Sequence, residues 1–246
     1  GSGHCAPDGG GSGVLMEHLL DLLSPQLRIL LTFVTALAMV LFSGVYFLPM
    51  LHRLKYGQSI REEGPASHRA KSGTPTMGGV VIILATVVAW LIGALVAGAG
   101  PSWSGILLAF LFVGLGTIGL LDDGIKIMRQ RSLGLHPSGK IVGQVAVASL
   151  FAGGTLIRPN EFGELAGTLE ISLARPTPLT LGFAGMAIGV ILYLIWTNLI
   201  VTAWSNATNL TDGLDGLAAG VSIFVFGAYT FIAYFQRIQA CTQPDV

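Results

Sequence analysis

Ser205-Asn-Ala-Thr-Asn-Leu-Thr-Asp-Gly-Leu-Asp-Gly216 is a polar stretch between two of the most apolar segments of the chain. An ionisable group at the centre of a bilayer costs about 2.5–3.5 kcal/mol, so a charge beside such segments usually faces protein, water or an ion. One interpretation is that Asp212 or Asp215 caps the helix that follows. Capping requires a single side chain, whereas this stretch holds two Asp and two Asn. We therefore predict a functional loop between two membrane-spanning helices.

The composition around this stretch is that of a membrane protein. Of 246 residues, 52% are hydrophobic and 11% charged, against about 25% charged in soluble domains. The formal net charge is zero, so the chain lacks the basic footprint of a nucleic-acid-binding protein. A helix needs about 20 apolar residues to cross the hydrocarbon layer. Six segments approach or exceed that length: 29–51, 77–97, 103–121, 141–157, 181–204 and 217–235.

These segments predict an all-α fold, a polytopic transmembrane helical bundle. The alternation of apolar and polar residues over 168–173 predicts a short strand, half of a β-hairpin-like segment in one outside loop. Gly185-x-x-x-Gly189 is a small-residue pair that would let helix backbones approach. Residues 1–15 are rich in Gly and Ser, which indicates a vector-derived flexible tail.

The basic residues predict how the spans are oriented. The 52–75 and 122–140 loops together hold nine of the thirteen Lys and Arg residues. Cytoplasmic loops carry an excess of basic residues. We therefore expect the N-terminus outside, with these two loops and the 205–216 loop in the cytoplasm.

Asp122 and Asp123 are predicted to close the third span. Two acids at the C-terminal end of a helix oppose its dipole by about 0.3–1 kcal/mol each, so Lys126 or a bound cation should compensate them. They could simply be an interfacial pair that reaches water. Span parity, however, places them on the same face as Asp212 and Asp215. Carboxylates beside cations suit a magnesium–phosphate site.

The loop before the second span is rich in Gly, Pro and basic residues, and it reads HRLKYGQSIREEGPASHRAKSGTPTMGG over 52–79. Gly78 and Gly79 open that span, where backbone amides at a helix N-terminus can approach a phosphate. Lys71 is the basic residue of this loop that we expect to contact a nucleotide or phosphate.

Three strings resemble the signature blocks of the phospho-N-acetylmuramoyl-pentapeptide transferases, within the polyprenyl-phosphate N-acetylhexosamine-1-phosphate transferase superfamily. They are GPASHRAKSGTPTMGG (64–79), IGLLDDGIK (118–126) and SNATNLTDGLDGLAAG (205–220). The likeness covers about residues 45–235. The acidic motifs are shared across the superfamily, and the first string is more specific to the muramoyl-pentapeptide branch.

The resemblance implies a Mg²⁺-dependent enzyme of the bacterial cytoplasmic membrane that acts on the cytoplasmic face. It would transfer phospho-MurNAc-pentapeptide from its UDP-linked donor to undecaprenyl phosphate, giving lipid I and UMP in peptidoglycan biosynthesis. Its expected partners are these two substrates and the lipid bilayer, with a homodimer as the candidate assembly. The roles that it implies are catalysis by Asp122, Asp123 and Asp212, substrate binding by Lys71, Lys126, Lys140, Asn209, Gly213 and Asp215, and metal binding by Asp122 and Asp123.

The chain also departs from the family. Gly124 stands where the family usually has an aromatic residue. The family has about ten spans, so residues 16–246 are expected to be the N-terminal part of the transferase domain. The principal metal-binding acid and a histidine-rich loop are expected beyond Val246, and residues 1–246 alone are expected to be inactive. The alternatives are a GlcNAc-1-phosphate transferase, an ion-coupled membrane transporter and a non-catalytic membrane fragment.

Overall fold

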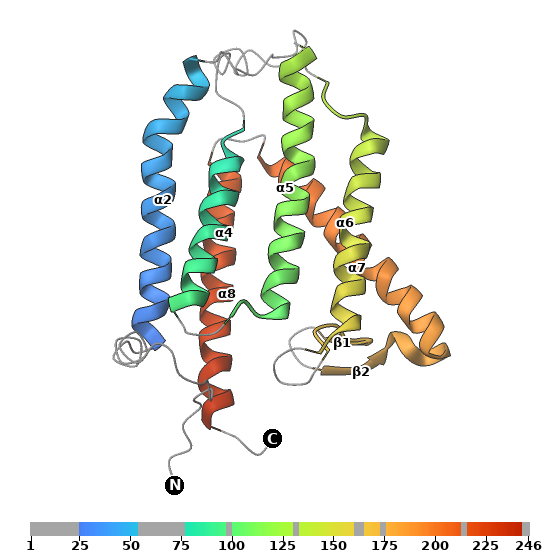
Figure 1. The fold of residues 1–246 in the computed structure, drawn as a ribbon. Coiled ribbons are helices and arrows are strands. Elements are labelled where there is room, and N and C mark those ends of the chain that lie inside the picture. The colour runs from blue at the N-terminus through green and yellow to red at the C-terminus, as the bar shows by residue number, and fades with distance from the viewer. Residues whose placement is uncertain are drawn as a thin grey trace. The chain divides into compact units, whose positions relative to one another are not determined.

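The computed structural model describes residues 25–53, 77–96, 100–129, 133–159, 165–172, 176–212 and 216–242. Each helix labelled α in Figure 1 contains a stretch long and apolar enough to cross a membrane. This confirms the predicted polytopic helical bundle. The helices are α2 (Pro25–Arg53), α4 (Gly79–Val96), α5 (Trp103–Arg129), α6 (Pro137–Ile157), α7 (Met186–Thr211) and α8 (Leu217–Thr242). The predicted tail, 1–15, lies outside the described residues.

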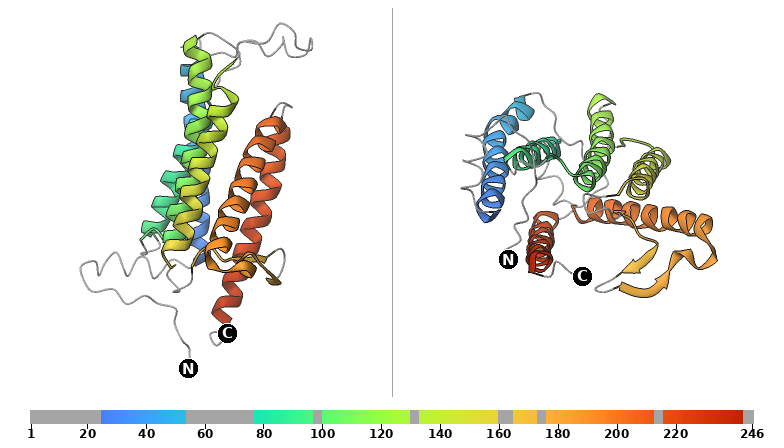
Figure 2. Two further views of the ribbon diagram at one scale, coloured as in Figure 1. Left: turned by 90° about the vertical axis from the view of Figure 1, so that its right-hand side faces the viewer. Right: turned by 60° about the horizontal axis from the view of Figure 1, so that its bottom comes forward.

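The chain divides into two compact units, whose boundary falls inside α7 between Thr202 and Ala203. In the larger unit, α2, α4, α5 and α6 lie side by side in chain order, as Figures 1 and 2 show. The smaller unit holds the last turns of α7 and the whole of α8. Each unit is described by itself below.

Small residues bring the helices of the larger unit close together. Ala148 and Ala152 of α6 are fully buried. A Cβ atom on Gly114 of α5 would lie 2.8 Å from Cγ1 of Val147. In lipid, helices associate through such close packing because there is little hydrophobic gain from apolar side chains that lipid would also cover.

Polar side chains join α6 to the first part of α7. The hydroxyl groups of Thr155 and Tyr193 are 2.8 Å apart, and Nδ2 of Asn198 donates to Oγ of Ser149 at 3.0 Å. Hydrogen bonds between transmembrane helices are worth about 0.6 kcal/mol on average and up to about 2 kcal/mol. Nothing in the sequence pattern singled out these pairs.

The segment between α6 and α7 forms the predicted hairpin. Strands β1 (Glu170–Ser172) and β2 (Pro176–Thr180) pair antiparallel, and a 3₁₀ turn η1 (Leu181–Ala184) leads to α7. Gly185 has φ +101° and precedes the helix. A Cβ atom on Gly189 would lie 3.0 Å from the Cα atom of Gly182. Gly189 thus brings α7 close to the 3₁₀ turn, whereas Gly185 lies before the helix and a Cβ atom on it would have nothing within 4 Å. Among the described residues, the backbone that approaches this predicted pair is therefore that of the turn and not that of another transmembrane helix.

The third span is longer than predicted. We expected Asp122 and Asp123 to close it, but α5 continues to Arg129. The acids therefore lie inside the helix, and the C-terminal turn carries Lys126 and Arg129 instead. Cations in the last turn of a helix interact favourably with the helix dipole. Lys126 also lies about one turn after each acid, so it can neutralise them and the helix can continue past them.

Candidate active site

Asp122, Asp123 and Lys126 form one charged cluster near the C-terminal end of α5. Nζ of Lys126 lies 2.7 Å from Oδ2 of Asp122 and 3.0 Å from Oδ1 of Asp123. The Asp122 side chain is 16% exposed, whereas those of Asp123 and Lys126 are each 35% exposed. The expected compensation of the acid pair by Lys126 is confirmed. The cluster keeps one net negative charge at a partly wet position.

The turn between α5 and α6 closes over Asp122. The backbone N–H of Leu135 donates to Oδ1 of Asp122 at 2.8 Å. Pro137 then begins α6, where its missing N–H is tolerated, and the N–H of Lys140 donates to the carbonyl of His136. Lys140 is close enough to have a favourable Coulomb interaction with Asp122. The fold thus brings two of the predicted site residues, Lys126 and Lys140, to the acid pair.

The start of α4 reaches the same place. Met77 has φ +73°, in the left-handed region that residues other than glycine rarely adopt. Its carbonyl accepts from the N–H of Val80 as the helix begins. A Cβ atom on Gly124 would lie 3.6 Å from Cε of Met77. Backbone outliers of this kind concentrate at functional sites, and the side chain of this one reaches Gly124, the residue after Asp123.

The second predicted loop follows α7 in the smaller unit. Asn209 and Asp212 are exposed, and the N–H of Asp212 donates to the carbonyl of Thr208 at 3.0 Å. Asp212 thus follows the last residue of α7. The position before α8 is held by Gly216, whose carbonyl accepts from the N–H of Gly220. Asp212 therefore does not cap α8, which contradicts the capping interpretation for that residue.

Three of the predicted site residues, Lys71, Gly213 and Asp215, lie outside the described residues. The predicted approach of the Asp122–Asp123 pair to the Asp212 loop remains a prediction, because those groups belong to different units.

The side chains near Asp122 would supply some, but not all, of the ligands that a divalent cation needs. Within the described ranges, no group of three or more His, Cys, Asp and Glu side chains could hold a metal. Both oxygens of Asp122 are engaged, whereas Oδ2 of Asp123 has no hydrogen-bond partner among the described residues. Mg²⁺ commonly takes one or two carboxylates and completes its shell with waters and substrate phosphates. The residues fit a cation bound in that way.

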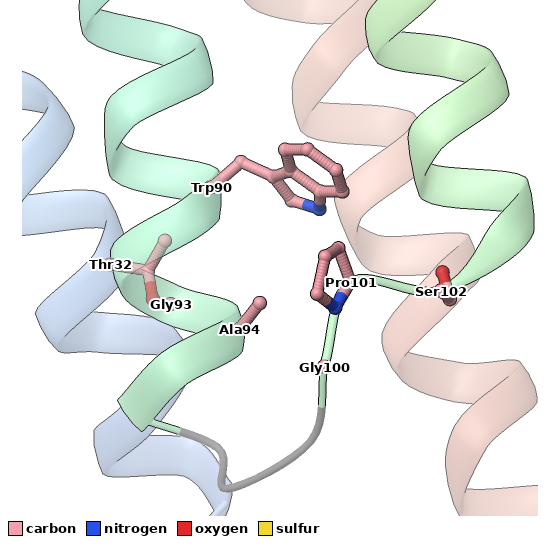
Figure 3. A pocket seen from close by; sticks show the side chains of 7 residues that line it. All are labelled: Thr32, Trp90, Gly93, Ala94, Gly100, Pro101 and Ser102. Carbon is pink, nitrogen blue, oxygen red and sulfur yellow. The ribbon is translucent and has the colours of Figure 1, made fainter.

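A pocket of about 280 Å³ lies at the other ends of α4 and α5 (Figure 3). None of the predicted site residues lines it. The pocket is separate from the acid pair, since Met77 and Asp123 lie where α4 begins and α5 ends. Its lining residues are Thr32, Trp90, Gly93, Ala94, Gly100, Pro101 and Ser102.

Sequence reasoning missed three residues of the site: Met77, Leu135 and Gly134, where a Cβ atom would lie 2.5 Å from the backbone oxygen of Asp122. The Gly-Leu-His-Pro run at 134–137 does signal a turn. A turn signal, however, says nothing about which side chain the turn will contact.

Comparison with known proteins agrees with the predicted resemblance. Residues 104–243 match the family described as Glycosyl transferase family 4, and residues 71–83 match Phospho-N-acetylmuramoyl-pentapeptide-transferase signature 1. The second match begins at Lys71 and includes Met77. It therefore includes the residue whose side chain reaches Gly124, and it ends in the first turns of α4.

Many curated proteins are similar to this chain. One is a phospho-N-acetylmuramoyl-pentapeptide-transferase of Beutenbergia cavernae, 49% identical over 216 residues, which are 88% of this chain and 60% of the relative. Proteins with the same name in Paenarthrobacter aurescens and Micrococcus luteus are 49% and 50% identical over 85% and 79% of this chain. The matches cover 58% and 54% of those two relatives. The chain thus spans three fifths or less of the relatives' length.

Proposed function

The chain belongs to glycosyl transferase family 4, and from that premise we propose that it is the N-terminal part of a phospho-N-acetylmuramoyl-pentapeptide transferase. The reaction is transfer of phospho-MurNAc-pentapeptide from its UDP-linked donor to undecaprenyl phosphate, with lipid I and UMP as products. The observation that carries the proposal is the acid pair with Lys126, held beside the helix start that matches the transferase signature.

The chemistry requires one phosphorus–oxygen bond to form and another to break. An oxygen of the lipid phosphate attacks the phosphorus that carries the sugar, and the bond from that phosphorus to UMP breaks. Such a reaction depends on positioning and on neutralised charge. Asp122 and Asp123 orient the attacking phosphate or accept its proton, and Asp212 is the third catalytic acid of this proposal. Lys71, Lys126 and Lys140 bind phosphate oxygens of the donor.

The loop after α7 binds the uridine end of the donor through Asn209, Gly213 and Asp215. A divalent cation, Mg²⁺ in this proposal, supplies positive charge to the diphosphate when bound, and Asp123 together with Asp122 would hold it. The principal protein ligand would come from beyond Val246. The site lies on the cytoplasmic face of the bacterial cytoplasmic membrane, with the N-terminus outside, and a homodimer is the proposed assembly.

The test uses the full native gene product that contains residues 16–246, purified in detergent. We expect lipid I and UMP from UDP-MurNAc-pentapeptide, undecaprenyl phosphate and Mg²⁺. Asp123→Asn and Asp212→Asn should each lower turnover by about 10²-fold or more, in the range of a lost acid or base. Glu170→Gln, an exposed acid of the hairpin, is the matched control and should retain activity.

Two results would contradict the proposal. Turnover within a few-fold of the parent in both Asp variants would remove these acids from the site. Product from UDP-GlcNAc but not from the muramoyl-pentapeptide donor would identify a GlcNAc-1-phosphate transferase instead.

A further inference from the structure

The short turn between α5 and α6 is joined to the acid pair by a hydrogen bond and two ion pairs. The backbone N–H of Leu135 holds Oδ1 of Asp122, and Oδ2 of the same carboxylate holds Lys126. Lys126 in turn contacts Oδ1 of Asp123. A main-chain donor cannot change rotamer, so this contact is the most rigid of the three. The orientation of the whole cluster therefore depends on where the turn sits.

Gly134 sets the distance between the turn and α5. A Cβ atom on Gly134 would clash with Oδ1 of Asp122, and it would lie 2.5 Å from the backbone oxygen and 2.8 Å from Cγ of the same residue. The carboxylate could rotate away from a new methyl group, but the backbone oxygen of α5 could not. A side chain at position 134 must therefore lift the turn away from the helix.

The same turn also leads directly into the first turn of α6. His136 and Ser138 are linked through Nδ1 and Oγ at 2.7 Å, and the carbonyl of His136 accepts the N–H of Lys140. Lifting the turn would therefore displace Lys140 as well as Asp122. A displacement of about 1 Å can cost about 10²-fold in rate when reacting groups must be aligned.

We propose that the Gly134–Leu135 turn is the positioning element of the acid pair. Leu135 orients Asp122 through its N–H, and Gly134 permits the approach that this contact needs. Neither residue touches substrate in this proposal, so both are positioning residues. The inference rests on the proposed transferase function for its kinetic consequence, but the contact itself can be tested without substrate or metal.

The kinetic test compares Gly134→Ala with Gly119→Ala in the full native gene product. Gly119 lies on α5 shortly before Asp122, and a Cβ atom there would have nothing within 4 Å. We expect Gly134→Ala to lower kcat by about 10²-fold with little change in the KM for the UDP-linked donor. Gly119→Ala should stay within about two-fold of the parent. If kcat of Gly134→Ala is unchanged, or falls only in proportion to the unfolded fraction, the proposal is wrong.

The second test measures hydrogen–deuterium exchange at the Leu135 amide of residues 1–246, with no substrate and no metal. We expect protection in the parent and in Asp123→Ala, and loss of protection in Asp122→Ala and Gly134→Ala. An unprotected Leu135 amide in the parent would overturn the inference. If the full native gene product makes no lipid I but residues 1–246 show this exchange pattern, the proposed function fails and the positioning contact remains.

Discussion

Replacing Lys126 with Met would remove the cation shared by the two acids and keep most of its aliphatic stem. Hydrogen bonds to charged groups are worth about 1.5–3 kcal/mol, whereas fully exposed ion pairs are worth about 0.2–1 kcal/mol. Lys126 and Asp123 are each 35% exposed and Asp122 is 16% exposed. We therefore assign about 1 kcal/mol to each contact, or about 2 kcal/mol for both. Repulsion between the two unshielded acids adds to this loss.

A loss of about 2 kcal/mol should lower the Tm of residues 1–246 in detergent by roughly 4–8 °C, for a chain of this length. The matched control is Arg129→Met, an exposed cation of the same helix that has no ion pair among the described residues. Lys126→Arg keeps the charge and should recover most of the loss. High salt should narrow the gap between parent and Lys126→Met, because partly exposed charges are screened.

A Tm of Lys126→Met within about 1 °C of that of Arg129→Met would refute this reasoning, since 1 °C corresponds to a few tenths of a kcal/mol for a chain of this length. The two ion pairs would then contribute nothing measurable to folding. A loss that persists unchanged at high salt would point to packing of the lysine stem instead of charge.

Two further predictions concern topology and packing. Gly124→Cys should react with a membrane-impermeant thiol reagent only when the cytoplasmic face is open to it, because span parity and the basic loops predict that this end of α5 lies inside. Labelling from outside in intact cells would reverse the predicted orientation. Gly114→Ala should be less stable than Gly119→Ala by about 1–3 kcal/mol, the cost of overpacking, because only the first would meet Val147, at 2.8 Å. Equal Tm values for these two variants would show that α5 and α6 do not pack as closely as described.

Part of the site could be predicted because the signal is local. Asp122, Asp123 and Lys126 lie three and four residues apart, and on a helix such residues are neighbours whatever surrounds them. The hairpin was likewise visible in an alternating run between two turn signals. The end of the third span was not predicted correctly, since charged residues suggest the membrane boundary and a helix can continue beyond it.

The rest of the site depends on contacts between residues that are distant in the sequence. The N–H of Leu135 reaches a carboxylate thirteen positions earlier, and the Met77 side chain comes within contact distance of Gly124. No periodicity encodes such a pairing, because it depends on how the turns direct each helix. The same holds for the 34 glycines, among which the pattern could not distinguish Gly114, packed on a neighbour, from Gly119, which has open space.

The sequence by itself determined that the chain is a helical membrane protein, which segments cross, and which charged side chains had to be compensated. These properties follow from apolar length and from spacing within one helix. Only the tertiary structure decided that the α5–α6 turn closes on Asp122 and that the Met77 side chain, just before α4, reaches Gly124. The physical reason is that residue spacing within one helix determines which side chains need burial or an opposite charge. Which segment packs against that helix depends on the shape and path of the whole chain.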